Sequence, residues 1–336
     1  MILIRIDTGS KSGLGHFKRV KSFIKYLNIK EYLIVTNYIS DVKNLKEKKV
    51  INLYSKKDKF KNELTDAKKF LNFIKKFSQI KTVIKDSYNL GYKWEKTVKK
   101  KIKNLVVIDD NINTKHYSDF YINHSPDILN LDRKIQAILK KNNKINCKFM
   151  IGPEYALFES RTRKIKRTSD FLFYNGGAGN LLIYEKIIKR LSKNFGNKIN
   201  IVVGPFSKNF RKLQNKFNNK NNVKLIHKPE SIVNFLSGTK VFISSAGISM
   251  FESSFLRVPT LLLKMNNNQN LTDKGYENLG HYFCLYKNDL KNEEKIEKLL
   301  ILMKNNYLSI KQMMQKKCLN INIIKKNYKK KFKNII

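Results

Sequence analysis

The chain has 336 residues, 41% of them hydrophobic, which is enough for two domains that each bury a core. Its formal net charge at pH 7 is +43, from 69 Lys and Arg residues against 26 Asp and Glu residues. Only nine of the basic residues are arginine, and lysine is spread along the whole chain among Asn, Ile and Tyr, as a genome rich in A and T would produce. We therefore expect no nucleic-acid partner, although the positive field favours anionic ligands.

The three cysteines lie far apart, and neither a CxxC pair nor a Cys/His metal spacing occurs. This usage predicts no disulfide framework, no metal site and no cofactor, and it is typical of a reducing compartment. The first residues enter a strand without a signal segment, and no apolar run reaches the length of about 18 residues that spans a bilayer. We expect a cytoplasmic monomer without stable membrane insertion.

Short apolar segments alternate with longer amphipathic ones along the chain. The predicted strands are 2–6, 32–36, 83–86, 105–109, 171–175, 200–204, 223–226, 241–244 and 260–263. This alternation predicts an α/β protein with parallel sheets joined by crossover helices. A charged, non-periodic segment at 151–169 is typical of a linker, so we expect Rossmann-like αβα domains at 1–155 and 168–315. The carboxyl ends of their strands would line an interdomain cleft.

The most informative motif is the glycine-rich turn 9–16, which lies between the first strand and an amphipathic helix. Gly13 and Gly15 let an anion approach the backbone N–H groups at a helix N-terminus. His16 closes the turn, where a neutral imidazole can take a proton from water. The alternative is a histidine that only caps or packs the start of the helix. The functional interpretation predicts an enzyme that acts on a nucleotide-diphosphate sugar.

A second strand-to-helix junction lies at 241–252, where a strand ends in small residues and a helix begins near Ser249. The N-terminus of this helix, at Gly247, Ile248 and Ser249, is suited to a diphosphate, and Glu252 could accept hydrogen bonds from a ribose. Ser249 and Glu252 also have the spacing of a capping box, which would explain both residues structurally. The sequence leaves the two interpretations of Glu252 open.

Three further segments follow predicted strands. The amide-rich run 266–270 could bind sugar hydroxyl and acetamido groups, or could reflect the general richness in asparagine. The segment 86–95 contains Trp94, the single tryptophan, which fits either a core or a platform for a sugar. Asp109 and Asp110 suggest a metal site or a solvated turn, and we predict the turn because no third ligand has suitable spacing.

Taken in order, these segments resemble one family, the UDP-2,4-diacetamido-2,4,6-trideoxy-β-L-altropyranose hydrolases of pseudaminic acid synthesis. The matching stretches are 7–19, 86–95, 107–110, 119–123, 152–157, 176–177, 245–252 and 268–269. The family is similar to the peptidoglycan N-acetylglucosaminyl transferase and shares its glycosyltransferase-B fold. The resemblance implies that the second domain holds UDP and that a basic C-terminal helix, within 316–336, returns toward the first domain.

The resemblance also implies roles for individual residues. His16 matches the general base, and Tyr88 and Asn268 match an active-site tyrosine and asparagine. The implied substrate- and UDP-binding residues are Gly13, Gly15, Gly177, Gly247, Ile248, Ser249, Glu252 and Gln269. This chain departs from the family at Ser87, where a histidine is usual, and at Val20, where a cysteine is usual.

These roles predict hydrolysis without a metal, in which His16 activates water and the C1–O bond to UDP breaks with inversion. The small-molecule partner would be the UDP-sugar. A glycosyltransferase of the same fold, with an acceptor in place of water, is the alternative within enzymes. A basic nucleic-acid-binding protein is the alternative of another class, but the chain shows no recognition motif.

Overall fold

The computed structural model describes residues 1–9, 12–37, 45, 47–58, 60–77, 80–129, 132–144, 146–161, 169–264, 272–317, 319–333 and 335. The chain divides into two units. Unit 1 comprises Met1–Thr8, His16–Leu157 and Asn322–Ile336, and unit 2 comprises Gly9–Gly15 and Phe158–Ile321. Among the described residues, no helix combines the length and the apolar character needed to cross a bilayer.

The described residues of unit 1 form a parallel sheet of seven strands. In spatial order the strands are β3 (Val50–Asn52), β2 (Tyr32–Thr36), β1 (Ile2–Ile6), β4 (Thr82–Asp86), β5 (Asn104–Ile108), β6 (Phe120–Asn123) and β7 (Lys148–Ile151). The chain first builds outward from β1 to β3 and then returns to add β4 on the other side of β1. The junction between β1 and β4 is therefore the topological switch point, at which sheets of this kind bind ligands.

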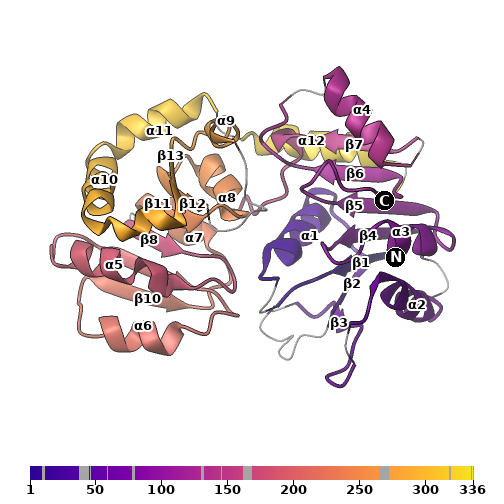
Figure 1. Ribbon diagram of the computed structural model, residues 1–336, viewed down its shortest axis with the longest axis horizontal. Helices are drawn as coiled ribbons and strands as arrows, with labels where there is room; N and C mark the ends of the chain where they lie inside the picture. Colours follow the sequence, from indigo (N-terminus) through magenta and orange to yellow (C-terminus); the bar gives the residue numbers. More distant parts are fainter. Residues whose placement is uncertain are drawn as a thin grey trace. The chain divides into compact units, whose positions relative to one another are not determined.

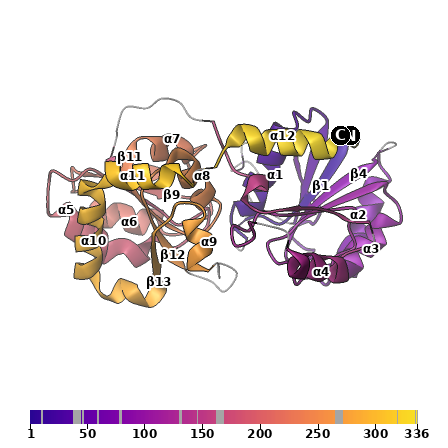
Figure 2. The ribbon, with the colours of Figure 1, turned by 90° about the horizontal axis from the view of Figure 1, so that it is seen from above.

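Helices cover both faces of this sheet. They are α1 (Gly15–Tyr26), α2 (Glu63–Ile74), α3 (Tyr92–Lys99), α4 (Arg133–Asn142) and α12 (Ile321–Phe332), with a short 3-10 turn at Pro153–Tyr155. Figure 2 shows α1 and α12 on one face of the sheet and α2, α3 and α4 on the other. Because side chains alternate along a strand, Leu3, Val83 and Leu105 pack on one side with residues of α2 and α3.

Unit 2 repeats this plan with six described parallel strands. In spatial order they are β10 (Val223–His227), β9 (Ile199–Val203), β8 (Ser169–Tyr174), β11 (Thr239–Ser245), β12 (Thr260–Lys264) and β13 (Phe283–Tyr286). The helices are α5 (Glu185–Ser192), α6 (Phe210–Phe217), α7 (Val233–Ser237), α8 (Ser249–Leu256), α9 (Asp273–Glu277), α10 (Glu293–Asn305) and α11 (Tyr307–Gln315), with 3-10 segments at Leu181–Tyr184 and Lys287–Lys291 (Figure 1).

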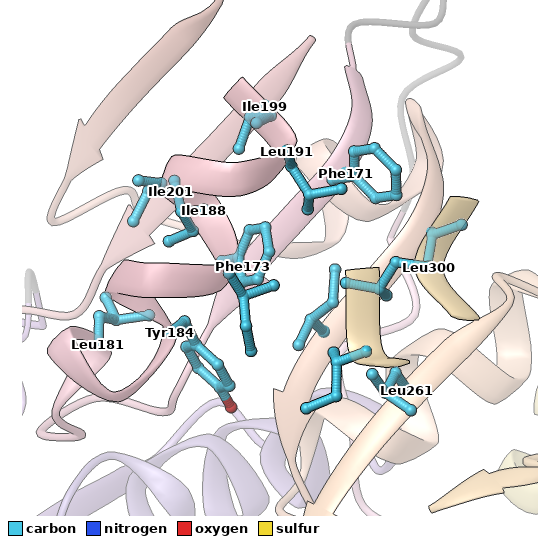
Figure 3. Packing of buried hydrophobic residues seen from close by; sticks show 14 of the residues in the cluster. Phe171, Phe173, Leu181, Tyr184, Ile188, Leu191, Ile199, Ile201, Leu261 and Leu300 are labelled. Carbon is cyan, nitrogen blue, oxygen red and sulfur yellow. The ribbon is translucent and has the colours of Figure 1, made fainter. Parts of the chain in front are cut away.

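The larger core of unit 2 lies on the face of its sheet covered by α5 and α10. Figure 3 shows Phe171 and Phe173 of β8 among side chains from α5, β9 and α10. The alternate residues of β8, Leu172 and Tyr174, face the opposite side and join a second cluster with Leu236 of α7. A strand buried on both faces needs an unbroken apolar run, which is the pattern that the sequence shows at 171–174.

The prediction of an α/β fold with two parallel, Rossmann-like sheets is confirmed. Each of the nine predicted strands is present, with ends that differ by at most two residues. The sequence analysis missed β3, β6, β7 and β13. Trp94 has an exposed fraction of 0% and packs in the core of unit 1, so the interpretation as a sugar platform is wrong.

Candidate functional site

Polar side chains gather at the carboxyl edge of the sheet of unit 1, beside the switch point. Asp86 is the last residue of β4, and His16 is the second residue of α1, the helix that follows β1. Asp110 follows β5 and His124 follows β6. Because neighbouring parallel strands end at the same edge, residues far apart in the sequence meet here.

The centre of this group is a pair formed by His16 and Asp86. The Nδ1 atom of His16 lies 2.5 Å from Oδ1 of Asp86, and the exposed fractions of the two residues are 4% and 0%. A carboxylate accepts the Nδ1–H proton and thereby fixes the tautomer, which leaves the lone pair on Nε2. A histidine held in this way is suited to take a proton from a reactant at Nε2.

Arg19, one turn after His16 in α1, keeps Asp86 in its charged form. Its Nε and Nη2 atoms donate to the two oxygens of Asp86, at 2.9 Å and 2.6 Å. Burial alone would raise the pKa of Asp86, but the positive charge of Arg19, together with His16, lowers it below its ordinary value. An ionised Asp86 is the state that can hold the Nδ1–H proton of His16.

The same arginine extends the network to Asp110. Nη1 of Arg19 donates to both oxygens of Asp110, at 2.8 Å and 2.7 Å, and Nε2 of His124 lies 3.3 Å from Oδ1 of Asp110. Burial opposes ionisation of Asp110, but Arg19 outweighs it and holds the pKa of this carboxyl well below its usual range. Asp86, Arg19 and Asp110 thus form an alternating row of charges.

Tyr88 joins this row from the loop after β4. Its hydroxyl donates to Oδ2 of Asp110, and its ring meets the ring of His16 edge-on with centroids 4.7 Å apart. Its exposed fraction is 53%, so one side of the ring faces outward beside His16. Its hydroxyl end, in contrast, is desolvated beside Asp110, and this desolvation together with the charge of Asp110 raises the pKa of Tyr88 above its ordinary value, which keeps the hydroxyl protonated. Tyr88 therefore presents an aromatic surface next to the base, while the proton of its hydroxyl is donated to Asp110.

The carboxylate of Asp7, the residue after β1, supports the loop that carries Tyr88. Its oxygens accept from the hydroxyl of Ser87, from Nδ2 of Asn89 at 3.0 Å and from Arg5 at 3.3 Å. Ser87 stands where the resembling family usually has a histidine, and here its hydroxyl ties β1 to the loop after β4. This contact fixes the start of the loop that positions Tyr88.

The structure corrects the prediction for Asp109 and Asp110, which do not lie in a solvated turn. Asp109 is buried, with an exposed fraction of 5%, and Asp110 pairs with Arg19. In the described parts of the chain, no three His, Cys, Asp or Glu side chains come together in a way that could hold a metal ion.

The glycine turn before α1 is held by its own backbone. Gly9 and Gly13 form an isolated antiparallel bridge, in which the Gly13 N–H donates to the Gly9 carbonyl at 2.7 Å and the Gly9 N–H donates back at 3.1 Å. Their φ angles of 120° and 68° lie in the region that favours glycine. The amide of Gly13 is thus engaged within the turn, and its role toward a ligand stays a prediction, as does that of Gly15, the first residue of α1.

In unit 2 the predicted UDP-binding residues follow β8 and β11. Gly177 lies in the turn after β8, where its carbonyl accepts from the Phe206 N–H at 2.9 Å. The same turn packs tightly, because a Cβ on Gly204 would come within 2.4 Å of the Gly177 carbonyl oxygen. Gly247 and Ile248 lie between β11 and α8, at the carboxyl edge of this sheet. These are the positions at which a parallel sheet offers a helix N-terminus to a phosphate.

The capping box predicted at Ser249 and Glu252 does not form. Ile248 is the N-cap residue of α8 and makes no side-chain cap, so Ser249 is already inside the helix. The Ser249 hydroxyl instead lies 3.1 Å from the hydroxyl of Ser244 in β11. Glu252 lies in the first turn of α8 with an exposed fraction of 0%. The capping-box interpretation of this pair of residues is therefore wrong, and the role of Glu252 toward a ribose stays a prediction.

Of the three predicted catalytic residues, the structure brings His16 and Tyr88 together. Asn268 and Gln269 lie outside the described residues. Sequence reasoning missed Asp86, Arg19, Asp110 and His124 as parts of the site. The available signal was an acidic or polar residue at or just after the end of three strands, at 86, 110 and 124. Their adjacency, however, depends on the order of the strands in the sheet.

Comparison with known proteins gives one curated relative and many similar structures. No family model matches the chain. It is 24% identical over 291 residues to an uncharacterized protein of Methanocaldococcus jannaschii, in a match that covers 80% of this chain and 56% of that protein. The chain therefore spans about half the length of the curated relative that it matches.

Several solved structures share the whole architecture. MurG of Acinetobacter baumannii superposes with a TM-score of 0.60 at 10% identity over 98% of this chain and 99% of that one. A UDP-glucosyltransferase of Polygonum tinctorium gives 0.61 at 11% identity over 98% and 97%. The UDP-GlcNAc 2-epimerase of Neisseria meningitidis gives 0.63 at 12% identity over 99% and 100%. At such low sequence identity, these similarities are evidence for the architecture alone. They show that the chain has the glycosyltransferase-B fold.

Proposed function

We propose that this chain is an enzyme that acts on a UDP-sugar and moves its glycosyl group onto an oxygen nucleophile. The observation that carries the proposal is the buried pair of His16 and Asp86 at the switch point of unit 1. A base oriented by a carboxylate is the arrangement that activates a hydroxyl or a water for attack. The similar structures include enzymes named for UDP-sugars, which supports this class of substrate.

In the proposed reaction, Nε2 of His16 takes the proton of the nucleophile as its oxygen bonds to the anomeric carbon. The C1–O bond to the diphosphate breaks, its electron pair leaves with UDP, and the configuration at C1 inverts. Asp86 stabilises the imidazolium that forms, and Arg19 keeps Asp86 ionised. Tyr88 offers its ring to the sugar beside His16. The scheme uses no metal or organic cofactor.

The UDP group is assigned to unit 2. We propose that the turn at Gly177 and the start of α8, at Gly247, Ile248 and Ser249, bind the diphosphate, because backbone N–H groups at a helix N-terminus favour anions. Glu252 would accept from the ribose, and Asn268 and Gln269 would bind the sugar. Stabilisation of the leaving diphosphate by such donors replaces a strong general acid.

Two nucleophiles fit this scheme. A hydroxyl acceptor makes the chain a glycosyltransferase, and the fold shared with MurG and a UDP-glucosyltransferase favours this version. Water makes it a hydrolase of UDP-2,4-diacetamido-2,4,6-trideoxy-β-L-altropyranose or a close UDP-amino-sugar. The ordered motifs from residue 7 to residue 269 favour the hydrolase, with free sugar as the product.

The test is release of UDP from a panel of UDP-sugars that includes this substrate, in water labelled with heavy oxygen. Release without an acceptor, with label in the sugar and none in UDP, supports the hydrolase. Release that requires an added alcohol or glycan acceptor supports the transferase. Conversion of a UDP-sugar into another UDP-sugar, with no UDP formed, would contradict both.

A variant pair links the activity to the base. His16→Asn should retain UDP binding and lose turnover, since no other side chain replaces Nε2. His227→Asn is the matched control, because His227 stacks on Phe210 in unit 2 at a centroid distance of 3.9 Å and has no part in the scheme. Full activity of His16→Asn would refute the assignment of the base.

A further inference from the structure

The last helix of the chain is strongly two-sided. The buried side chains of α12 are Ile324, Tyr328 and Phe332, and they pack into unit 1. The rings of Tyr328 and Phe332 lie 5.6 Å and 5.1 Å from that of Phe23 in α1. The Tyr328 hydroxyl donates to the carbonyl of Tyr155 at 2.8 Å. These contacts fix which side of α12 faces outward.

The outward side of α12 is a row of four lysines that we call the lysine stripe. It consists of Lys326, Lys329 and Lys330 of α12 and of Lys333, the residue after the helix, and all four are exposed. Their spacing of three and four residues aligns them on one side of the helix, since an α-helix turns once every 3.6 residues. Figure 2 shows α12 lying along the surface of unit 1, on the same face of its sheet as α1.

Nothing near the stripe in the sequence balances its charge. The last acidic residue of the chain is Glu297, and the 39 residues from Lys298 to Ile336 contain lysine but no Asp or Glu. Like charges at these helical spacings repel each other and weaken the helix. Composition accounts for abundant lysine, but not for four on one side of a helix whose other side is apolar.

The lysine stripe contains lysine and no arginine. A lysine ammonium is a point charge without the bidentate geometry with which arginine reads phosphates and bases. Four or more lysines on an amphipathic helix are suited to a diffuse anionic surface such as a layer of phospholipid headgroups. Ile323, with an exposed fraction of 52%, stands one turn before Lys326 and two turns before Lys330, and it could enter the apolar edge of such a layer.

We propose that unit 1 docks through the lysine stripe onto a membrane surface that contains anionic phospholipid, with α12 parallel to that surface. The attachment is peripheral and reversible, and it does not require the activity proposed above. It would hold the enzyme next to a membrane without any spanning segment. Salt weakens it, because the contact is made by exposed charges.

The test is sedimentation of the full chain with phosphatidylcholine vesicles that contain or lack phosphatidylglycerol. Each lysine near such a surface contributes about a fivefold gain in partitioning, from about 1 kcal/mol per charge. The quadruple variant Lys326→Gln, Lys329→Gln, Lys330→Gln and Lys333→Gln should therefore bind several-hundred-fold more weakly, as an order of magnitude. The parent should not bind vesicles that lack the anionic lipid.

The matched control removes the same charge elsewhere in unit 1. Lys61, Lys68, Lys93 and Lys100 are exposed and belong to the neighbourhood of α2 and α3, on the opposite face of the sheet. Changing these four to Gln should leave vesicle binding nearly intact. Equal loss in the two quadruple variants would overturn the proposal in favour of net charge alone, and undiminished binding of the stripe variant would also overturn it.

A second readout separates lipid from nucleic acid and from the enzyme reaction. Duplex DNA that binds more tightly than the vesicles, through the same four lysines, would overturn the lipid assignment. Far-ultraviolet circular dichroism should show that both variants keep their helices. Turnover of a soluble UDP-sugar should be the same in the parent and the stripe variant, so failure of the membrane proposal leaves the catalytic one unaffected.

Discussion

At the scale of single residues, the decisive contact is the one between Asp86 and His16. The change Asp86→Asn places an amide donor opposite Nδ1, which forces the proton of the ring onto Nε2 and removes the base. We expect kcat to fall roughly 10³–10⁴-fold with little change in KM, the size of effect seen when such a carboxylate becomes an amide. Steady-state kinetics on a UDP-sugar from which the parent releases UDP would measure this fall in kcat.

The control for that variant is Asp132→Asn. Asp132 caps α4 by accepting from the Ile135 N–H at 2.8 Å, and an asparagine keeps an oxygen there. Its kinetics should match the parent. If Asp86→Asn also matched the parent, Asp86 would be structural and the base would act without it.

Arg19 should contribute more to the free energy of unfolding than an exposed arginine does. It satisfies the buried Asp86 and the partly buried Asp110 at the same time. The change Arg19→Met should lower the free energy of unfolding by about 3–5 kcal/mol, because it leaves a charged group buried without a partner. Urea unfolding followed by circular dichroism gives this value.

The comparison for Arg19 is Arg190, which pairs with Glu297 at 2.6 Å on the surface of unit 2. Arg190→Met should cost about 1 kcal/mol or less, since exposed ion pairs contribute little. Equal effects of the two changes would show that the row of charges in unit 1 adds no special stability.

The candidate site could be predicted only in part, for a reason that belongs to the residue scale. His16 could be found because its glycine turn is local in the sequence. Asp86, 70 residues away, becomes its partner only because β4 lies beside β1, and strand order is set by packing of the whole sheet. The roles of Asp110 and His124 depend on β5 and β6 in the same way.

At the scale of elements, Asp66 joins α2 to the sheet of unit 1. Its carboxylate accepts from Arg5 of β1 at 2.6 Å, from the Tyr54 hydroxyl at 3.0 Å and from Nε1 of Trp94 in α3 at 2.8 Å. Asp66→Asn should lower the free energy of unfolding by about 3 kcal/mol, since Arg5 stays buried, loses its nearest counter-charge and keeps the longer contact with Asp7 at 3.3 Å. The urea midpoint measures the loss.

Asp58 gives the contrasting case on the same unit, because the ion pair that it forms with Lys69, at 2.6 Å, is exposed to solvent. Asp58→Asn should leave the urea midpoint unchanged. A loss as large as that for Asp66→Asn would mean that burial does not determine the value of these contacts.

The strands missed by the sequence analysis are the shortest ones. β3 has three residues and β6, β7 and β13 have four each, whereas every strand that was predicted has five or more. An apolar run as short as 283–286 in β13 cannot be told from the apolar residues of a loop or a helix by its pattern alone. The interior strand β6, Phe120–Asn123, was missed because it is short and ends in a polar residue.

At the scale of the whole molecule, buried titrating groups make stability depend on pH. Burial lowers the pKa of His281 from 6.5 to about 4, while its Nε2 lies 2.8 Å from the Met250 carbonyl in α8. Between these values the unfolded chain binds a proton that the folded chain does not. Stability is therefore complete above 6.5 and falls as the pH drops toward 4, by roughly 3 kcal/mol in total.

The measurement is the urea midpoint as a function of pH for the parent and for His281→Gln, which keeps an N–H donor. The variant should lose the part of the slope that lies between 6.5 and 4. A parallel slope in the two proteins would contradict the assignment. In unit 1, Glu95 adds a loss of stability at lower pH, between about 4.5 and 2. Burial opposes the ionisation of Glu95, but Lys85 and His116 lower its pKa from 4.5 to about 2.

The burial of Trp94 has a spectroscopic consequence. It is the single tryptophan of the chain, it lies in the core of unit 1, and its indole N–H is bonded to Asp66. Intrinsic tryptophan emission of this protein therefore originates in one unit only and starts from a shielded indole. A red shift during denaturation would report the opening of unit 1, whereas an event confined to unit 2 would be optically silent. If nucleotide binds to unit 2, as proposed above, emission that responds to added nucleotide would show that binding in one unit affects the other.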